Sequence, residues 1–304
     1  GAAQESEKPV LFLWTGSVKD TGSLPRLQAG PVPVFYLPGK CARAVRRLLD
    51  YHRARERILG ERGEKGLARD RPLGALDRLK EIVVEAEGLA LTEHDSKRAL
   101  SLFGIPVTRE SLCRSPEEAV EAARQMGYPV ALKVASPRVV HKTEVGGVRL
   151  GVANGDELVS AYREMLATVR ARSPEARIDG VLVQEMVSGG VELIVGVSRD
   201  VQFGPVLMLG LGGVLVEALG AASWRVCPVS PREAGDMVAE VRGLSRILGG
   251  HRGKPRADVD ALVKALVRIS WLAVWARDEI LSLDVNPLAV LPEGQGVVAL
   301  DALI

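Results

Sequence analysis

The stretch HKTEVGGVRLG, residues 141 to 151, follows the strand-like run VALKVAS at residues 130 to 136. Together they bring a basic strand residue, Lys133, near a histidine, His141, and a flexible glycine pair. A site that holds a nucleoside triphosphate and moves its terminal phosphate needs a cation, an acceptor for the phosphoryl group and a flexible backbone close together. This stretch therefore predicts a phosphate-handling site within an α/β fold.

Oxygen-rich segments stand near the other end of the chain. DVNPL (284 to 288) and VVALD (297 to 301) supply Asp284, Asn286 and Asp301. Magnesium prefers oxygen ligands and usually takes only one or two protein carboxylates together with substrate phosphates. These segments predict a magnesium site, and the alternative is a simple Asx turn before the proline.

Composition narrows the classes of function. The 304 residues suffice for two domains, and a formal net charge of +2 argues against a dedicated nucleic-acid binder. No apolar run reaches the roughly 18 residues of a membrane span, and no signal segment opens the chain. The three cysteines, Cys41, Cys113 and Cys227, show neither metal-ligand nor disulfide spacing. We therefore expect a cytoplasmic protein without nucleic-acid or membrane partners.

The N-terminal part has an α/β pattern of its own. Residues 9–15 and 31–37 predict buried strands, and the helical spacing of apolar residues after Pro38 completes a β-α-β-α piece. This piece is too small for a whole Rossmann domain and indicates the tail of one. The charged, glycine-containing residues 61–90 predict a linker with a weak helix around residues 76–86.

Start and stop signals predict two helices after the linker. Thr92 followed by Asp95 is typical of a helix start, and Gly104 ends the pattern. Ser115 before a proline starts the next helix, which Gly127 ends. Further elements are predicted as helices near residues 156–172 and 257–276 and as strands within 181–187, 192–198, 203–219 and 282–301.

Lys133, the glycine pair and His141 each allow two interpretations. An unpaired buried charge is costly, so Lys133 is either a phosphate ligand or a lysine on the exposed face of a half-buried strand. Gly146-Gly147 can present bare backbone N–H groups to an anion, or form only a hairpin turn, and it is not a P-loop. His141 is either a phosphoryl acceptor or a surface histidine.

The run VLVQEMV (181 to 187) also has two interpretations. Its backbone could read an adenine edge as a strand between two lobes, with Glu192 placed for a ribose hydroxyl. Alternatively, the SGGV stretch that follows turns the chain, and VLVQEMV pairs with ELIVGVS (192 to 198) in a hairpin. Periodicity does not separate the two.

Taken together, these segments resemble the nucleotide-binding part of the ADP-forming acyl-CoA synthetases. This family belongs to the succinyl-CoA synthetase superfamily, whose β-subunit side carries an ATP-grasp domain. The resemblance runs from about Leu91 to Ile304 and rests on blocks in family order: LTEHDSKRAL, FGIPV, GYPVALKVASP, HKTEVGGVRLG, GVLVQEMV, ELIVGVSRD, FGPVLMLGLGGVLVE, HRGKPRADV and LDVNPL. Residues 9–57 resemble the end of the family's ligase-CoA domain. The family's CoA-binding Rossmann domain has no counterpart in this chain, nor has the loop with the first phospho-acceptor histidine.

The resemblance implies the fold and the reaction. The fold would be an α/β, ATP-grasp fold of two α+β lobes over residues 91–304, preceded by a partial flavodoxin-like, Rossmann-like unit over residues 1–60 and the linker 61–90. The reaction would be acyl-CoA + ADP + phosphate ⇌ carboxylic acid + CoA + ATP, catalysed by an acid–thiol ligase of the ADP-forming acetate–CoA ligase type. This chain would perform the phosphohistidine and nucleotide half with ATP or ADP and Mg²⁺. A CoA-binding α-type domain or subunit would bind coenzyme A and the acid, and oligomers are possible.

The resemblance also implies roles for individual residues. Lys133 would hold the ATP phosphates, and His141 matches a histidine that some members use as a second phosphoryl relay. Asn286 and Asp301 would bind magnesium, with Asp284 nearby. The remaining nucleotide contacts would be the loop Val145, Gly146, Gly147 and Val148 over the phosphates, the adenine hinge Glu185, Met186 and Val187, and Glu192 at the ribose.

One departure from the family pattern favours a different class of function. Ala221 stands where an aspartate is typical, ahead of the arginine that matches Arg225. The alternative is a non-catalytic, ligand-sensing regulatory lobe of the kind found in some bacterial lysine acyltransferases. A third possibility is an ATP-grasp carboxylate–amine ligase, which would not respond to coenzyme A.

Overall fold

Two units make up the chain, Gly1–Gly66 and Leu67–Ile304. The structure is a computed structural model, and it describes residues 9–15, 22–61, 72–86, 88–137, 139, 142–212, 222–250 and 255–304. Within these ranges, none of the helices combines the length and the apolar character needed to cross a membrane.

The smaller unit has the predicted β-α-β-α order. Its elements are β1 (Phe12–Leu13), α1 (Ser23–Gln28), β2 (Val34–Phe35) and α2 (Pro38–Glu61), and the two strands pair in parallel. The prediction that residues 9–15 form a buried strand is wrong, because Phe12 and Leu13 are 41% and 38% exposed. A two-stranded ribbon offers too little surface to bury its own side chains.

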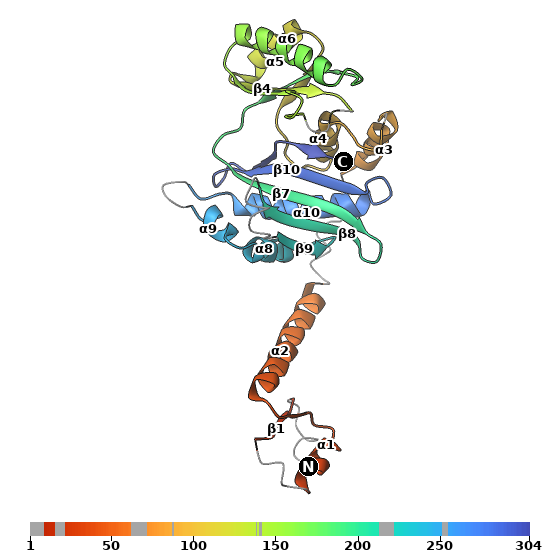
Figure 1. Cartoon of the computed structure of the whole chain (residues 1–304), viewed down its shortest axis with the longest axis vertical. Helices are drawn as coiled ribbons and strands as arrows, with labels where there is room; N and C mark the ends of the chain where they lie inside the picture. Colours follow the sequence, from red (N-terminus) through yellow and green to blue (C-terminus); the bar gives the residue numbers. More distant parts are fainter. Residues whose placement is uncertain are drawn as a thin grey trace. The chain divides into compact units, whose positions relative to one another are not determined.

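Two antiparallel sheets organise the larger unit, each with its own helices (Figure 1). The four-stranded sheet has the order β3-β6-β4-β5 and the six-stranded sheet the order β11-β10-β7-β8-β9, with β12 also paired to β10. This confirms the expected two α+β lobes. The strands are β3 (Glu110–Cys113), β4 (Val130–Ala135), β5 (Val148–Val152), β6 (Gly180–Glu185), β7 (Val191–Asp200), β8 (Gly204–Leu211), β9 (Ala222–Val226), β10 (Ser282–Val290), β11 (Val297–Ala299) and β12 (Ala302–Leu303).

The helices of the larger unit divide between the two sheets. In Figure 1, α5 and α6 lie beside β4, and α10 lies against β7, β8 and β10. The helices are α3 (Ala75–Glu85), α4 (Glu93–Leu102), α5 (Pro116–Met126), α6 (Gly155–Arg172), α8 (Pro231–Glu240), α9 (Leu244–Leu248) and α10 (Val259–Trp275). α3 lies within the predicted linker, yet its Leu79 is fully buried in the core of this unit.

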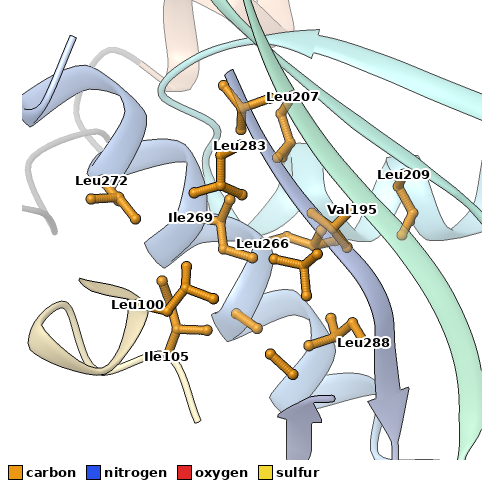
Figure 2. Close-up of a cluster of buried hydrophobic side chains, with 14 of the residues drawn as sticks. Leu100, Ile105, Val195, Leu207, Leu209, Leu266, Ile269, Leu272, Leu283 and Leu288 are labelled. Atoms are coloured by element: carbon orange, nitrogen blue, oxygen red, sulfur yellow. The ribbon is translucent and has the colours of Figure 1, made fainter. Parts of the chain in front are cut away.

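The main core lies between α10 and the six-stranded sheet. Figure 2 shows Leu266 and Ile269 of α10 close to Val195 of β7, and all three are fully buried. Leu100 of α4 and Ile105 after it join the same cluster. Burying a side chain of this size contributes about 1.5–3 kcal/mol relative to exposing it. This packing fixes α4, which carries part of the site, against the large sheet.

A second core fills the space between the four-stranded sheet and its helices. Val130, Leu132 and Val134 of β4 pack in it, together with Ala119 of α5 and Leu158 of α6. Because side chains alternate along a strand, Ala131, Lys133 and Ala135 must point to the opposite face. That face is turned away from α5 and α6.

The helix signals are confirmed, whereas one turn prediction is wrong. Thr92 accepts a hydrogen bond from the Asp95 amide at the start of α4, and Ser115 caps α5 through the Glu118 amide. The hairpin between 181–187 and 192–198 does not form, because β6 and β7 belong to different sheets. The predicted strand beyond Gly212 lies outside the described residues.

Candidate functional site

Lys133 lies on the face of β4 that points away from α5 and α6. The whole of β4 is buried, and the Lys133 side chain is only 11% exposed, so the alternative of a lysine on a solvent-exposed face is wrong. Its ammonium group donates to the Leu300 carbonyl at 3.1 Å and lies 3.8 Å from Asp301 Oδ2. Lys133 therefore connects the four-stranded sheet with the C-terminal strands of the large sheet.

A buried carboxylate, Glu93, gathers the cations of the site. Its Oε1 accepts hydrogen bonds from Lys133 at 2.5 Å and from Lys97 at 2.8 Å, and its Oε2 accepts one from Lys142 at 2.8 Å. The Glu93 side chain is 2% exposed. One carboxylate at the start of α4 thus binds three ammonium groups from three segments of the chain.

Lys97 is the deepest of the three lysines, with a side chain 1% exposed. Besides Glu93 it donates to Glu110 Oε2 at 2.7 Å, to Gln184 Oε1 at 3.0 Å and to Thr108 Oγ1 at 3.2 Å. Glu110 in turn contacts His94 Nδ1 at 2.8 Å. These contacts use all the donors of Lys97, and they satisfy a buried charge that would otherwise be costly.

Charge compensation holds Glu93 ionised. Burial alone would raise its pKa, but the ammonium groups of Lys133, Lys97 and Lys142 outweigh burial and lower the pKa from 4.5 to about 2. The pKa of Asp301 moves the other way: burial raises it, against the opposing effect of Lys133. Glu93 is therefore a permanent negative charge beneath the lysines.

Sequence reasoning missed Glu93, Lys97 and Glu110. Glu93 looks like an ordinary acid in the first turn of a helix, and Lys97 like its exposed partner one turn later. The available signal was the amphipathic pattern of α4, because Lys97 lies between Ser96 and Ala99 on the buried side of the helix. A lysine at such a position needs a buried acid.

The predicted metal residues do come together. Asp284, Asn286 and Asp301 line one cavity of about 310 Å³, which Glu93 and Lys142 also line. Strand register explains the meeting: β10 pairs with β7 up to Val285 and resumes at Leu288 after an irregularity, and β12 pairs with Asp284 and Val285. The backbone N–H of Asn286 donates a hydrogen bond to the backbone carbonyl of Asp301 at 3.2 Å. An Asx turn alone would not bring these three residues to one cavity.

The donor set fits a magnesium ion that is shared with phosphates. Burial, followed by the charge of Asp301, raises the pKa of Asp284, so the carboxylates of Asp284 and Asp301 repel each other. A divalent cation would relieve that repulsion. Among the residues that the structure describes, no group of three or more His, Cys, Asp or Glu side chains is placed to bind a metal ion without such shared ligands. Two carboxylates and an amide suit magnesium, which completes its coordination with water and substrate oxygens.

The glycine loop is a tight turn over β4. A Cβ on Gly147 would lie 2.5 Å from Val134 Cγ1, so only glycine fits there, and Gly146 has φ of +75°. Both amides are used inside the turn, because Gly147 N–H donates to Lys142 O at 2.7 Å and Gly146 N–H to Thr143 O at 3.2 Å. The expectation of bare N–H groups is therefore wrong for this conformation. Val145 and Val148, on either side, are half-buried.

The predicted adenine hinge is the connection between the two sheets. Glu185 ends β6, and its carboxylate accepts hydrogen bonds from Arg109 N at 2.8 Å and Arg109 Nε at 2.6 Å. Met186 is exposed and Val187 half-buried on the way to β7, where Glu192 is exposed. None of these four residues lines the cavity that holds Asp284 and Asp301. Their role in binding a nucleotide stays a prediction.

Two residues singled out by the sequence, His141 and Ala221, lie outside the described residues. The described neighbours of His141, Val139 and Lys142, both line the cavity. Arg225, which follows Ala221 in the chain, pairs with Glu240 at 2.5 Å.

Comparison with known proteins identifies relatives of the larger unit. Residues 82–304 match the family described as ATP-grasp domain. The chain is 43% identical to the acetate–CoA ligase (ADP-forming) I of Archaeoglobus fulgidus over 90% of its length, but this covers only 39% of that relative. It is 36% identical to the β subunit of acetate–CoA ligase (ADP-forming) II of Pyrococcus furiosus, covering 76% of this chain and 97% of that subunit.

A solved structure agrees with these relatives. The dinucleotide-forming acetyl-coenzyme A synthetase 1 of Ca. Korarchaeum cryptofilum, in complex with coenzyme A, Ca-AMPCP and HgCl⁺, superposes with a TM-score of 0.71 at 43% identity. The match covers 76% of this chain and 98% of that one. None of these relatives supports the alternative of a non-catalytic sensing lobe.

Proposed function

The chain belongs to the ATP-grasp family, in the β-subunit-like branch of the ADP-forming acetate–CoA ligases, and we propose that it performs the nucleotide half of acid–thiol ligation. In the overall reaction, acyl-CoA, ADP and phosphate are converted reversibly to a carboxylic acid, CoA and ATP. The observation that carries the proposal is the cavity that Lys142 lines together with Asp284, Asn286 and Asp301, with Lys133 next to it, 3.8 Å from Asp301 Oδ2. That combination suits a nucleotide polyphosphate.

The nucleotide half is a phosphoryl transfer between a histidine and ADP. In the direction of ATP cleavage, an imidazole nitrogen of His141 attacks the terminal phosphorus, an N–P bond forms, and the bond to the ADP oxygen breaks. Such a transfer depends mainly on positioning and on neutralising charge. Lys142 is the cation that lines the cavity, and Lys133 lies next to it, 3.8 Å from Asp301 Oδ2.

Asp284, Asn286 and Asp301 would hold Mg²⁺, which would supply positive charge to neutralise the phosphates. These residues line the same cavity as Lys142, on β10 and just before β12. The turn Val145–Val148 would cover the phosphates after it rearranges. Glu185, Met186 and Val187 would contact adenine through their backbone, and Glu192 would contact the ribose.

The other half of the reaction requires a partner. The Pyrococcus relative is the β subunit of a split enzyme, and this chain spans 39% of the longer Archaeoglobus relative. We therefore infer a CoA-binding α-type domain or subunit that binds coenzyme A and a small carboxylic acid. It would form the acyl phosphate and deliver the phosphoryl group. The three cysteines are free, which suits a reducing cytoplasm.

Transfer of label from γ-labelled ATP tests the proposal. The chain is incubated with the labelled nucleotide and Mg²⁺, and protein-bound label is tested for acid lability and base stability. We expect such label in the native chain and none in His141→Ala. His52→Ala is the matched control, because His52 is an exposed histidine of the smaller unit that pairs only with Glu56, at 3.2 Å.

The outcomes separate the candidate functions. Label retained in His141→Ala would refute the role of that histidine. Nucleotide binding without any label, even with an α-type partner present, would favour a non-catalytic sensing lobe. If neither ATP nor ADP bound the chain, the proposed function would be wrong.

A further inference from the structure

We propose that Glu93 is a positioning residue for phosphoryl transfer, whose two carboxylate oxygens hold the ammonium groups of Lys133 and Lys142 side by side beneath the terminal phosphates. This inference rests on the proposed function and adds to it a residue whose carboxylate oxygens are already taken up by lysines. Glu93 acts through the two lysines.

The contacts divide the carboxylate between the lysines. Lys133 reaches Oε1 at 2.5 Å from β4, and Lys142 reaches Oε2 at 2.8 Å from the segment before the glycine turn. Two cations on the two oxygens of one carboxylate must be close neighbours. Without a negative charge between them they would repel each other, so their closeness depends on Glu93.

Accessibility distinguishes these two lysines from the third. Lys97 is 1% exposed and spends its remaining donors on Glu110, Gln184 and Thr108, so it cannot reach a ligand. Lys133 and Lys142 are 11% and 15% exposed. Lys142 lines the cavity, and Lys133 lies behind Asp301, with its ammonium group 3.1 Å from the Leu300 carbonyl and 3.8 Å from Asp301 Oδ2. A phosphate in the cavity can therefore bind Lys142 directly and feel the charge of Lys133 next to it, while Glu93 continues to hold both lysines.

Burial excludes other roles for Glu93. With its side chain 2% exposed and its oxygens already bonded to three ammonium groups, it has no room for a metal ion. A carboxylate that stays ionised in this position gives the lysines a fixed arrangement before the substrate arrives. Charges that are already in position need little reorganisation when the reaction occurs. Such preorganisation accounts for a large part of the transition-state stabilisation by electrostatic sites.

The test compares the binding of ATP and AMP, each with Mg²⁺, by titration calorimetry. AMP lacks the outer phosphates, so the ratio of the two affinities reports the contacts made by the lysines. In Glu93→Gln we expect this ratio to fall by about tenfold to a hundredfold, as for the loss of a hydrogen bond to a charged group, while the affinity for AMP stays the same. A general loss of structure would lower both affinities together.

Two further variants make the test specific. Glu110→Gln is the matched control, because Glu110 is a buried acid of the same cluster that contacts Lys97 and His94 and neither Lys133 nor Lys142. It should destabilise the chain and leave the ratio unchanged. Glu93→Asp keeps the charge but shortens the side chain by one methylene, which draws the carboxylate back from both lysines. It should fold, and its ratio should fall by several-fold.

The results separate this inference from the proposed function. If the native chain binds neither nucleotide, the proposed function has failed. If it prefers ATP and both Glu93 variants keep that preference, only the positioning role is refuted. If Glu93→Gln does not fold, Glu93→Asp decides the matter. A loss of preference in Glu110→Gln as large as in Glu93→Gln would show that the effect is merely structural.

Discussion

Three lysines, Lys97, Lys133 and Lys142, bind Glu93. Replacing Lys97 by methionine should destabilise the larger unit more than the same replacement of either of the other two. Methionine keeps the length of the side chain and fills most of its volume, but it removes the charge. Lys97 is 1% exposed, and its ammonium group has four partners, Glu93, Glu110, Gln184 and Thr108. The substitution leaves both carboxylates without their shared cation.

The size of the effect follows from these contacts. Removing one partner of a buried ion pair costs about 3–5 kcal/mol, because the remaining charge stays buried. Glu93 keeps Lys133 and Lys142, whereas Glu110 keeps only His94. Most of the cost should therefore come from Glu110. Adding Glu110→Gln to Lys97→Met should recover about 1 kcal/mol or more, since a neutral amide is cheaper to bury than an unpaired carboxylate.

Urea unfolding, followed by tryptophan fluorescence, measures this effect. With a slope of about 2–3 kcal/mol per molar urea, the midpoint should fall by about 1–2 M. Lys142→Met is the matched control, because it removes the same group from the same carboxylate at a side chain that is 15% exposed. It should cost about 1 kcal/mol or less. Equal midpoints for the two variants would refute the reasoning.

Three further predictions concern pH, backbone and metal. Burial raises the pKa of Glu93, but three lysines outweigh burial and lower it from 4.5 to about 2. The ionised carboxylate therefore contributes about 3 kcal/mol to the free energy of unfolding above pH 4.5, and this contribution is lost as the pH falls toward 2. The free energy of unfolding should depend less on acid pH in Glu93→Gln. Gly147→Ala should cost about 1–3 kcal/mol in thermal unfolding, because the new Cβ would meet Val134 Cγ1 at 2.5 Å, whereas Gly235→Ala, with no atom within 4 Å, should not destabilise the chain. Burial and the charge of Asp301 raise the pKa of Asp284, so its ionised form is disfavoured in the fold. Asp284→Asn should therefore raise the unfolding midpoint in the absence of Mg²⁺ and should weaken Mg²⁺ binding. Unchanged Mg²⁺ affinity would show that Asp284 is not a metal ligand.

Local signals in the sequence predicted α4, α5, α6 and α10 and indicated α3, whereas α8 and α9 were not predicted. Thr92 and Ser115 cap helices through the side-chain hydrogen bonds that their residue types suggest. Prediction failed where the outcome depended on distant partners. The stretch between β6 and β7 has the composition of a tight turn, yet the chain passes there from one sheet to the other, because each strand finds its partners far away in sequence.

The same distinction holds for the site. Lys133 and the oxygen-bearing residues near the C-terminus could be singled out, because each stands out from apolar neighbours within a few residues, and their roles as phosphate and metal ligands stay predictions. Glu93 could not, because its meaning comes from Lys133 and Lys142, which lie 40 and 49 positions away. Neither Glu93 nor Lys142 is unusual when its own neighbours in the sequence are considered. Only the packing of α4 against both sheets makes one buried carboxylate the common partner of three lysines.

The cavity brings opposite charges together, and this suggests the form in which the nucleotide binds. Lys142 lines it together with Asp284 and Asp301, and Lys133 lies next to it, 3.8 Å from Asp301 Oδ2. A bare polyphosphate would be attracted by the lysines and repelled by the two carboxylates. A metal ion held by the two carboxylates would turn their repulsion of the polyphosphate into attraction. The nucleotide should therefore bind as its magnesium complex, with Asp284, Asn286 and Asp301 as the residues that would hold the metal and Lys142 as the cation of the cavity lining.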